Sequence, residues 1–393
     1  MKISPLQLTS ILICFLMNML DGMDVMVVSY AAPSIAASWA ISSGDLGLVF
    51  SAGLLGMSIG AMFLAPRADK VGRKKIIMIC TTLMGLSVFA TSWASSVEIM
   101  MLLRVFSGIG VGGVLASTAT LTAECAPPNT KDFWVSFVMS GYPVGAVISG
   151  FAATTIIPNY GWQAMFKIAG ISSLMAIPIV YFLLKESEEF LKKTADKKNT
   201  GVATLLNSEY KKPTLWLWLA IFMAFATLYF LTTWIPKLAS GTGLSIELAI
   251  YAGTIFNLGA FCGIVSQGYL SAKFGLQKTI FWYLIFTAFL MVVFGFFKGA
   301  VFVLILFGLL GFGIQGGFVG MYSVAARLYP VSIRATGIGW SVGAGRVGAI
   351  AGPLLGGLLI GVGLSMSANF IIFSIPTIIA GIAILFIHPK EKN

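Results

Sequence analysis

Long apolar segments, bounded by charged residues, proline or glycine, recur along the whole chain. A helix needs about 20 apolar residues to cross a bilayer, whereas a membrane strand needs about ten of alternating polarity. Only 10% of the 393 residues are charged and the mean hydropathy is +0.94, which excludes soluble enzymes, secreted disulfide scaffolds and disordered chains. We therefore predict an all-α membrane protein. Its twelve predicted transmembrane helices cover 8–38, 45–66, 75–95, 98–123, 132–157, 163–184, 213–237, 246–271, 278–297, 300–326, 334–362 and 366–387.

One long polar interruption divides the chain near its middle. Residues 185–212, KESEEFLKKTADKKNTGVATLLNSEYKK, are typical of a solvated linker, in part an amphipathic surface helix. We expect an N-terminal six-helix bundle over 1–184 and a C-terminal six-helix bundle over 213–393. The four cysteines are widely scattered, and we interpret them as small buried apolar residues: Cys14, Cys80, Cys125 and Cys262.

The basic residues are unevenly distributed between the two predicted faces of the membrane. Loops on the side of both termini hold 20 of the 25 lysines and arginines, three others lie near the opposite face, and Arg104 and Arg346 lie within spans. Because basic residues are retained on the cytoplasmic side, we predict a cell inner membrane protein with both termini in the cytoplasm. The net charge of +11 thus indicates membrane topology, and no nucleic-acid partner is expected.

The two halves repeat with a constant offset of 203 positions. The positions related by this offset include the pairs Pro33/Pro236, Gly56/Gly259, Gly60/Gly263, Gly72/Gly275, Gly108/Gly311, Gly110/Gly313 and Gly145/Gly348. Two parallel six-helix repeats, related by an axis along the membrane normal, are typical of transporters that bind their substrate between the halves near the midplane.

Several motifs resemble those of the major facilitator superfamily, over the whole chain. They are Asp69 to Lys75 (DKVGRKK) between spans two and three, Arg104 with Gly108 and Gly110 in span four, and Gly141-Tyr142-Pro143-x-Gly145 in span five. Within the superfamily, four further features resemble the aromatic acid:proton symporters. They are Asp21-Gly22-Met23-Asp24, Trp234-Ile235-Pro236, Leu328-Tyr329-Pro330 with Arg334, and Arg346. The resemblance implies the major facilitator fold, with spans one, four, seven and ten lining a central cavity.

Two acidic residues lie within the first predicted span. Asp21 and Asp24 are three positions apart and therefore share a helix face. An ionised carboxylate inside a bilayer is costly unless it meets a cavity, a partner or a proton. Since the only histidine, His388, lies in the C-terminal tail, we predict that Asp21 and Asp24 couple transport to protons. The alternative is a buried salt bridge that only orients helices.

Arg346 lies about a dozen residues into span eleven, near the predicted midplane. A guanidinium there suits a carboxylate, which it binds through two parallel hydrogen bonds. We predict a substrate-binding role; the alternative is a permanent pair with an acid on a neighbouring helix. Arg104, nearer the outer end of span four, fits a substrate role and a scaffold role equally well. The cavity implied by the resemblance adds four candidate substrate-binding residues: Tyr229, Trp234, Gln315 and Tyr322.

Charged residues at the predicted cytoplasmic ends of the spans are interpreted as a gate. Glu124 and Arg327 are equivalent positions of the repeat, and Asp69 is placed to meet the positive N-terminal end of span eleven. The alternative for such residues is ordinary solvated loop charge. The predicted gating residues are Asp69, Arg73, Glu124, Arg327 and Arg334.

No phosphate-binding loop, metal-ligand cluster or nucleophile–base arrangement is visible in the sequence. We therefore predict no enzyme activity, no catalytic residue, no metal and no cofactor, with protons as the coupling ion. The predicted function is symport of a proton with a small organic anion, an aromatic carboxylate, by a monomer in the lipid bilayer. The alternatives are a proton-driven antiporter that exports drugs or metabolites, favoured by the span-five motif, and a receptor built on the same helices.

Overall fold

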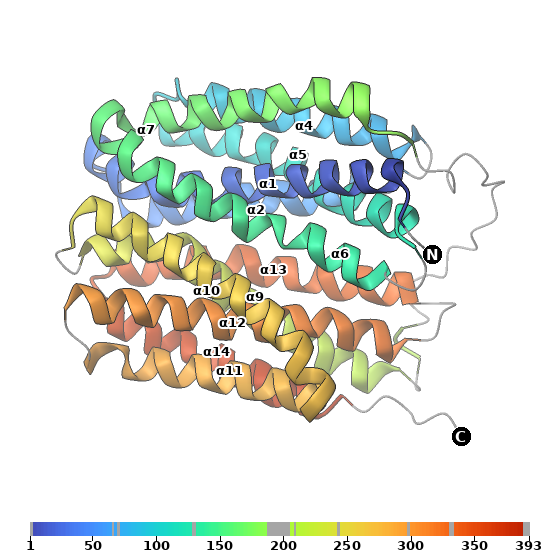
Figure 1. Ribbon diagram of the computed structural model, residues 1–393. Helices are drawn as coiled ribbons and strands as arrows, with labels where there is room; N and C mark the ends of the chain where they lie inside the picture. The colour runs from blue at the N-terminus through green and yellow to red at the C-terminus, as the bar shows by residue number, and fades with distance from the viewer. Residues whose placement is uncertain are drawn as a thin grey trace. The chain divides into compact units, whose positions relative to one another are not determined.

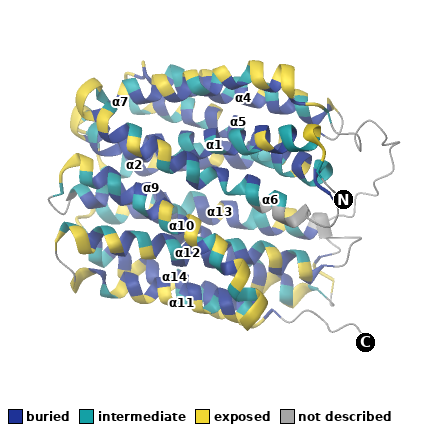
Figure 2. Cartoon of the chain, in the orientation of Figure 1, coloured by how far each residue is buried: buried dark blue, intermediate teal, exposed yellow. Residues whose placement is uncertain are grey.

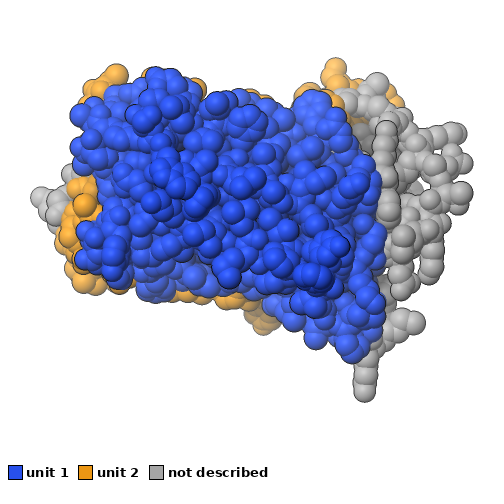
Figure 3. Space-filling model, turned by 90° about the horizontal axis from the view of Figure 1, so that it is seen from above, with its two compact units in different colours: residues 1–195 blue, residues 196–393 orange. Residues whose placement is uncertain are grey.

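Helices account for all regular secondary structure in the part of the chain that the computed structural model describes. That part comprises residues 3–64, 67–68, 71–127, 131–186, 205–207, 210–241, 244–296, 299–329 and 334–387. The helices gather into two compact units, residues 1–195 and 196–393, which Figure 3 colours separately. The division falls inside the segment expected to be a linker, most of which lies outside the described residues.

The first unit is built from long apolar helices (Figure 1). They are α1 (Pro5–Trp39), α2 (Ser43–Ile59) with a following π-helical turn (Gly60–Leu64), α4 (Arg73–Thr91), α5 (Val97–Cys125), α6 (Lys131–Met139) and α7 (Gly141–Leu183). Helix α1 packs against α5 and α7, α2 packs against α5, and α4 packs against α5 and α7. Helix α5 is therefore central to the unit.

Helix α7 contains two membrane spans. The apolar segment Phe137–Leu183 has 47 residues, roughly 70 Å if it were one straight helix and more than twice the thickness of a bilayer core. Gly161 interrupts it with φ 78° and ψ 165°, a conformation that glycine adopts without a steric penalty. The chain turns there, so the eleven apolar stretches found among the described residues amount to the twelve spans predicted.

The second unit repeats this order of helices. They are α9 (Lys211–Gly241), α10 (Ile246–Phe274), α11 (Leu276–Val293) with a 3₁₀ turn (Phe294–Phe296), α12 (Ala300–Leu328), α13 (Arg334–Gly361) and α14 (Met366–Leu385). Helix α9 packs against α13 and α14, α10 against α12, and α11 against α12 and α14.

The offset of 203 positions holds in three dimensions, which confirms the two six-helix repeats. Helices α5 and α12 are 203 positions apart at both ends. A Cβ added to Gly145 would lie 1.9 Å from the carbonyl oxygen of Met19, and one added to Gly348 would lie 2.1 Å from that of Phe222. Since Met19 and Phe222 are also 203 positions apart, α1 and α7 meet through the same backbone contact as α9 and α13.

Large apolar side chains are exposed on both units. Figure 2 marks exposed positions in yellow, among them many along α7 and α11. On α10, Leu258, Val265 and Tyr269 form such an exposed stripe at helical spacing. Cys262 lies on the same stripe and is exposed, so the prediction that it is buried was wrong; Cys14 and Cys80 are buried. A lipid-facing apolar position cannot be told from a core position by composition alone.

The close approach of α9 and α13 gives a first prediction. We expect Gly348→Ala to cost about 1–3 kcal/mol of stability, because its methyl group would overlap the Phe222 carbonyl. Gly343→Ala is the matched control on the same helix: no atom lies within 4 Å of its Cβ position, and alanine favours the helix. Thermal unfolding in detergent should show a lower midpoint for Gly348→Ala alone. Equal midpoints for the two variants would contradict the contact.

Candidate functional site

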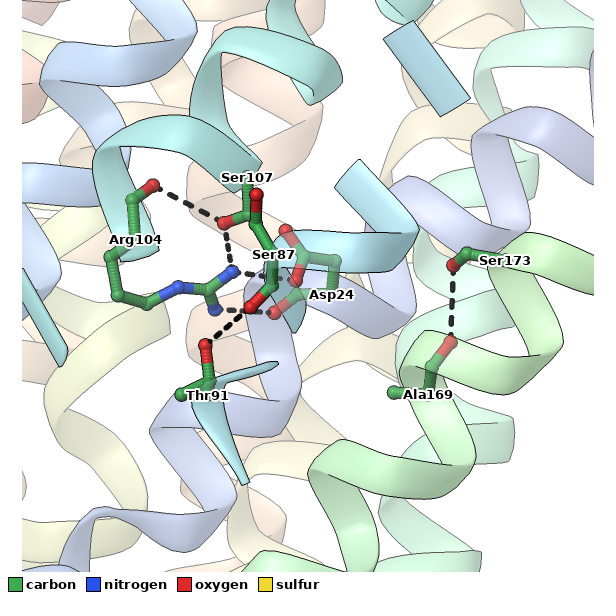
Figure 4. Close-up of polar contacts among 7 residues, drawn as sticks. All are labelled: Asp24, Ser87, Thr91, Arg104, Ser107, Ala169 and Ser173. Carbon is green, nitrogen blue, oxygen red and sulfur yellow. Dashed lines mark hydrogen bonds and ion pairs between the residues drawn. The ribbon is translucent and has the colours of Figure 1, made fainter. Parts of the chain in front are cut away.

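Asp24 of α1 and Arg104 of α5 form a buried ion pair (Figure 4). Arg104 Nη2 lies 2.6 Å from Asp24 Oδ1, and Nη1 donates to the Asp24 carbonyl oxygen at 3.2 Å. Ser107, one turn along α5, also accepts a hydrogen bond from Nη2. Only 4% of the Asp24 side chain and 3% of the Arg104 side chain are exposed. Charges so far from water are tolerated when they are paired, so this pair joins spans one and four within the first unit.

Buried polar side chains occupy three successive turns of α1. Asp21 lies one turn before Asp24 and is 1% exposed. Asn18 lies a further turn back, and its Nδ2 donates to Thr118 Oγ1 of α5 at 3.0 Å. In the second unit, the positions equivalent to Asp21 and Asp24 are Ala224 and Thr227. The candidate proton-binding acids are therefore confined to the first unit.

Arg346 of α13 lies against aromatic side chains of α9. Its Nη1 donates to the Tyr229 hydroxyl at 3.4 Å, and its guanidinium carbon lies 5.8 Å from the centre of the Phe225 ring. The face of an aromatic ring attracts a cation. Arg346 is 6% exposed. Its own unit offers few acids as permanent partners, because Glu247, in the first turn of α10, is the only acidic residue in the spans of that unit.

Two aromatic pairs build the surroundings of Arg346. Phe225 stacks on Tyr229 at 5.6 Å, and Phe318 of α12 meets Tyr322 edge-on at 5.3 Å. The pairs join where Phe225 and Phe318 meet edge-on at 4.6 Å. The two phenylalanines are buried, whereas the two tyrosines are partly exposed. Through these ring contacts Tyr322 belongs to the same aromatic cluster as Phe225, whose ring lies beside Arg346. A guanidinium and two hydroxyls thus share an otherwise aromatic setting, which suits a planar anion.

Two further residues were predicted to bind substrate, Trp234 and Gln315. Trp234 is fully buried, and its Nε1 donates to the Pro353 carbonyl oxygen at 3.0 Å, so it packs α9 against α13. Gln315 is a partly exposed residue of α12. Of the predicted set, the structure therefore brings Tyr229 into contact with Arg346 and places Tyr322 in the aromatic cluster beside it. It makes Arg104 the partner of Asp24.

Among the predicted gating residues, Arg73 and Glu124 form a second buried pair. Arg73 Nη2 lies 2.8 Å from Glu124 Oε1, and the side chains are 1% and 7% exposed. Arg73 Nη1 also donates to the Ala68 carbonyl oxygen at 3.1 Å. Arg327, the repeat equivalent of Glu124, is exposed at the end of α12. Asp69 and the side chain of Arg334 lie outside the described residues.

Glu186, three residues after the end of α7, caps the first turn of α4. Its carboxylate oxygens accept hydrogen bonds from the backbone N–H groups of Arg73 at 2.9 Å and Lys74 at 3.2 Å. The N-cap residue, Gly72, has φ 106° and no side chain to offer, so the distant carboxylate satisfies the helix end in its place. Lys74 Nζ donates to the Tyr181 carbonyl oxygen at 2.7 Å, which adds a second link between α4 and α7.

The sequence interpretation missed several of these residues: Phe225, Phe318, Ser107, Lys74 and Glu186. The two phenylalanines had a usable signal, since each lies four positions before a candidate tyrosine and therefore on the same helix face. Ser107 lies three positions after Arg104 and had the same kind of signal. The capping contact of Glu186 had none, because it joins residues 113 positions apart.

The two carboxylates that meet Arg73 give a second prediction. We expect Glu124→Gln to cost about 3–5 kcal/mol, because it removes the charge of the carboxylate that pairs with the buried Arg73 guanidinium. Glu186→Gln makes the same change at a partly exposed cap and should cost about 1 kcal/mol. Thermal unfolding of both variants in detergent measures the difference. A loss for Glu186→Gln as large as that for Glu124→Gln would argue against the buried pair.

Comparison with known proteins agrees with this architecture. The family model of the Major Facilitator Superfamily matches residues 14–267 and 238–393 of this chain. The 4-hydroxybenzoate transporter PcaK of Pseudomonas aeruginosa is 32% identical, over 98% of this chain and 93% of that protein. The gallate transporter of Pseudomonas putida is 29% identical, over 98% and 92%. The crystal structure of a D-xylose-proton symporter, 19% identical, shares the fold with a TM-score of 0.81 over 98% of both chains. The chain therefore belongs to the Major Facilitator Superfamily.

Proposed function

We propose that this protein is a transporter, not an enzyme, and that it imports an aromatic carboxylate together with one or more protons by alternating access. The observation that carries the proposal is the buried guanidinium of Arg346 in contact with Tyr229 and Phe225. The names of the relatives support the substrate class, because they transport 4-hydroxybenzoate and gallate.

The chemistry around Arg346 fits both parts of such a substrate. The carboxylate would accept two parallel hydrogen bonds from the guanidinium, and the ring would pack against the partly exposed faces of Tyr229 and Tyr322. The tyrosine hydroxyls would then be available to polar ring substituents. A small number of polar groups in an aromatic setting is the usual composition of a small-molecule site.

Proton coupling is assigned to Asp21 and Asp24 of the first unit. The ion pair of Asp24 with Arg104 at 2.6 Å supports this assignment, because protonation of the carboxylate would remove its attraction for the guanidinium. A proton would thereby change how α1 and α5 hold each other, and it would also offset the charge of an incoming anion. Coupling follows if this rearrangement and anion binding at Arg346 favour the same conformation of the transporter.

The orientation and the gate are part of the same proposal. The excess of lysine and arginine on one face supports an inner membrane protein with both termini in the cytoplasm. The buried pair of Arg73 and Glu124 would then lie at the cytoplasmic end of the first unit, where it would hold α4 and α5 as one rigid body. Asp69, Arg327 and Arg334 are proposed to complete the gate.

The test is uptake of radiolabelled 4-hydroxybenzoate into proteoliposomes that contain the purified protein. Accumulation is expected when the lumen is alkaline, with protons entering at the same time as substrate, and it should vanish when an ionophore collapses the gradient. Empty liposomes are the control. Accumulation that requires an acidic lumen would instead indicate the antiporter. Absence of counterflow with 4-hydroxybenzoate, gallate and benzoate alike would refute an aromatic acid transporter.

A further inference from the structure

We propose that Phe225 is a positioning residue for the substrate anion: its buried ring holds the Arg346 guanidinium in the orientation that binds the carboxylate. This inference rests on the proposed function of Arg346. Phe225 itself is 1% exposed, so it acts through the arginine and is not available to touch substrate.

Phe225 contacts both partners of the hydrogen bond that orients Arg346. The guanidinium carbon lies 5.8 Å from the centre of its ring, within reach of a cation–π interaction. The Tyr229 ring lies 5.6 Å away and nearly parallel, at 17°. Phe318 of α12 meets the Phe225 ring edge-on, with the ring centres 4.6 Å apart. A ring fixed on these sides presents one defined surface to the arginine.

Gly345, the residue directly before Arg346, makes room for this ring. A Cβ at position 345 would lie 2.7 Å from Phe225 Cδ2 and 2.8 Å from Cε2, and 2.6 Å from Ile221 Cγ2. Real Cβ atoms do not approach neighbours so closely, so any larger residue at position 345 would displace the ring. The glycine that positions the ring and the arginine that the ring holds are thus consecutive on α13.

The first unit has the same two positions with the residue types exchanged. Phe225 corresponds to Gly22, Gly345 to Tyr142, and Arg346 to Pro143. There the small residue lies on α1, where a Cβ would come within 2.0 Å of the Tyr142 carbonyl oxygen, and the helix backbones meet directly. The fold can therefore be packed at this point without an aromatic ring on the first helix of the unit. An aromatic ring at the first-helix position occurs in the unit that carries the arginine, which favours a role toward that arginine over a role in packing alone.

The physical benefit is preorganisation. An arginine side chain has several rotatable bonds, and ordering it when a ligand binds costs free energy. A guanidinium that is already held in place has little conformational freedom left to lose, so binding costs less. Removing the ring face should therefore weaken anion binding about 3- to 30-fold, which corresponds to the range of cation–π interactions. Binding of a neutral amide analogue, which gains little from an oriented cation, should change less.

The experiment compares Phe225→Leu with Phe230→Leu, a matched control on the same helix. Phe230 is also fully buried, but it stacks on Phe373 at 3.8 Å. Titration in detergent with 4-hydroxybenzoate and its amide should show the acid weakened about 3- to 30-fold in Phe225→Leu and within about twofold of wild type in Phe230→Leu. Thermal unfolding should show that Phe225→Leu and Phe230→Leu are both less stable than wild type. Trifluorophenylalanine at position 225, which keeps the ring shape but weakens its attraction for cations, should reproduce the affinity loss without the stability loss.

Gly345→Ala tests the same contact from the other side. Alone, it should displace the ring and weaken acid binding; in the Phe225→Leu background it should add little, since the ring it displaces is gone. Fully additive effects, or a Phe225→Leu variant that binds the acid as Phe230→Leu does, would overturn the inference. Arg346→Ala separates the two levels: if it abolishes acid binding while Phe225→Leu leaves it intact, only the positioning role fails, and if it binds the acid normally, the proposed anion site fails as well.

Discussion

Arg346→Lys is expected to weaken binding of an aromatic carboxylate about 5- to 150-fold, or roughly 1–3 kcal/mol. The lysine keeps the positive charge but loses the planar fork that makes two parallel hydrogen bonds. It also loses the flat group that now lies over Phe225 and donates to Tyr229. A lysine ammonium group should therefore be a poor substitute for the Arg346 guanidinium, because it keeps the charge but not the planar geometry.

The signature of the anion site is selectivity between acid and amide. Wild type should bind 4-hydroxybenzoate well and its amide poorly, whereas Arg346→Lys should discriminate less and Arg346→Ala least of all. Titration of both ligands at one fixed pH in detergent measures this ratio. Arg67→Lys, the same substitution at an exposed position, is the control. An Arg346→Lys variant that binds the acid as tightly as wild type would remove the bidentate role.

The sequence was sufficient to predict the helices and their repetition, because both depend on local signals. Apolar length marks a span, and glycines at a constant offset mark the repeat; the contacts of Gly145 and Gly348 show that those glycines are the points where backbones touch. When a repeat builds the same backbone contact twice, glycine occurs at both equivalent positions. Such a glycine can therefore be recognised from a single sequence.

The site could be predicted only as a set of candidates, since partners are decided by packing between distant segments. Asp24 and Arg104 were both recognisable as costly charges within spans, yet 80 positions separate them and nothing local joins them. By sequence, Trp234 is as plausible a ligand as Tyr229, but its indole N–H donates to the Pro353 carbonyl oxygen and packs α9 against α13. Polarity within a span indicates that a residue needs a partner, but not which partner it has.

The departures from the repeat are more informative about function than the repeat itself. Asp24 and Arg104 correspond to Thr227 and Phe307 in the second unit, and Arg346 corresponds to Pro143 in the first. One unit thus carries the buried acids and the other the guanidinium in its aromatic setting. If the proposed roles hold, proton and anion bind to different repeats, and only a conformational change that both repeats share can couple them.

Asp24→Asn is expected to abolish accumulation driven by a proton gradient, because asparagine keeps the size of the side chain but cannot bind a proton in the relevant range. The single variant has a second effect that must be separated from the first. It leaves Arg104, 3% exposed, without its counter-charge, and this should cost about 3–5 kcal/mol of stability. Loss of transport alone would therefore not distinguish an uncoupled protein from an unfolded one.

A double variant, Asp24→Asn with Arg104→Gln, resolves the two effects. Removing both charges of a buried pair leaves no charge without a partner, so the stability lost in the single variant should largely return. Counterflow, which needs no proton gradient, should then be measurable, while accumulation against a gradient stays absent. Asp21→Asn leaves the pair intact, and its accumulation shows whether the neighbouring acid also binds the proton. If the double variant and Asp21→Asn both accumulate 4-hydroxybenzoate at wild-type rates, the assignment of coupling to these two acids is wrong.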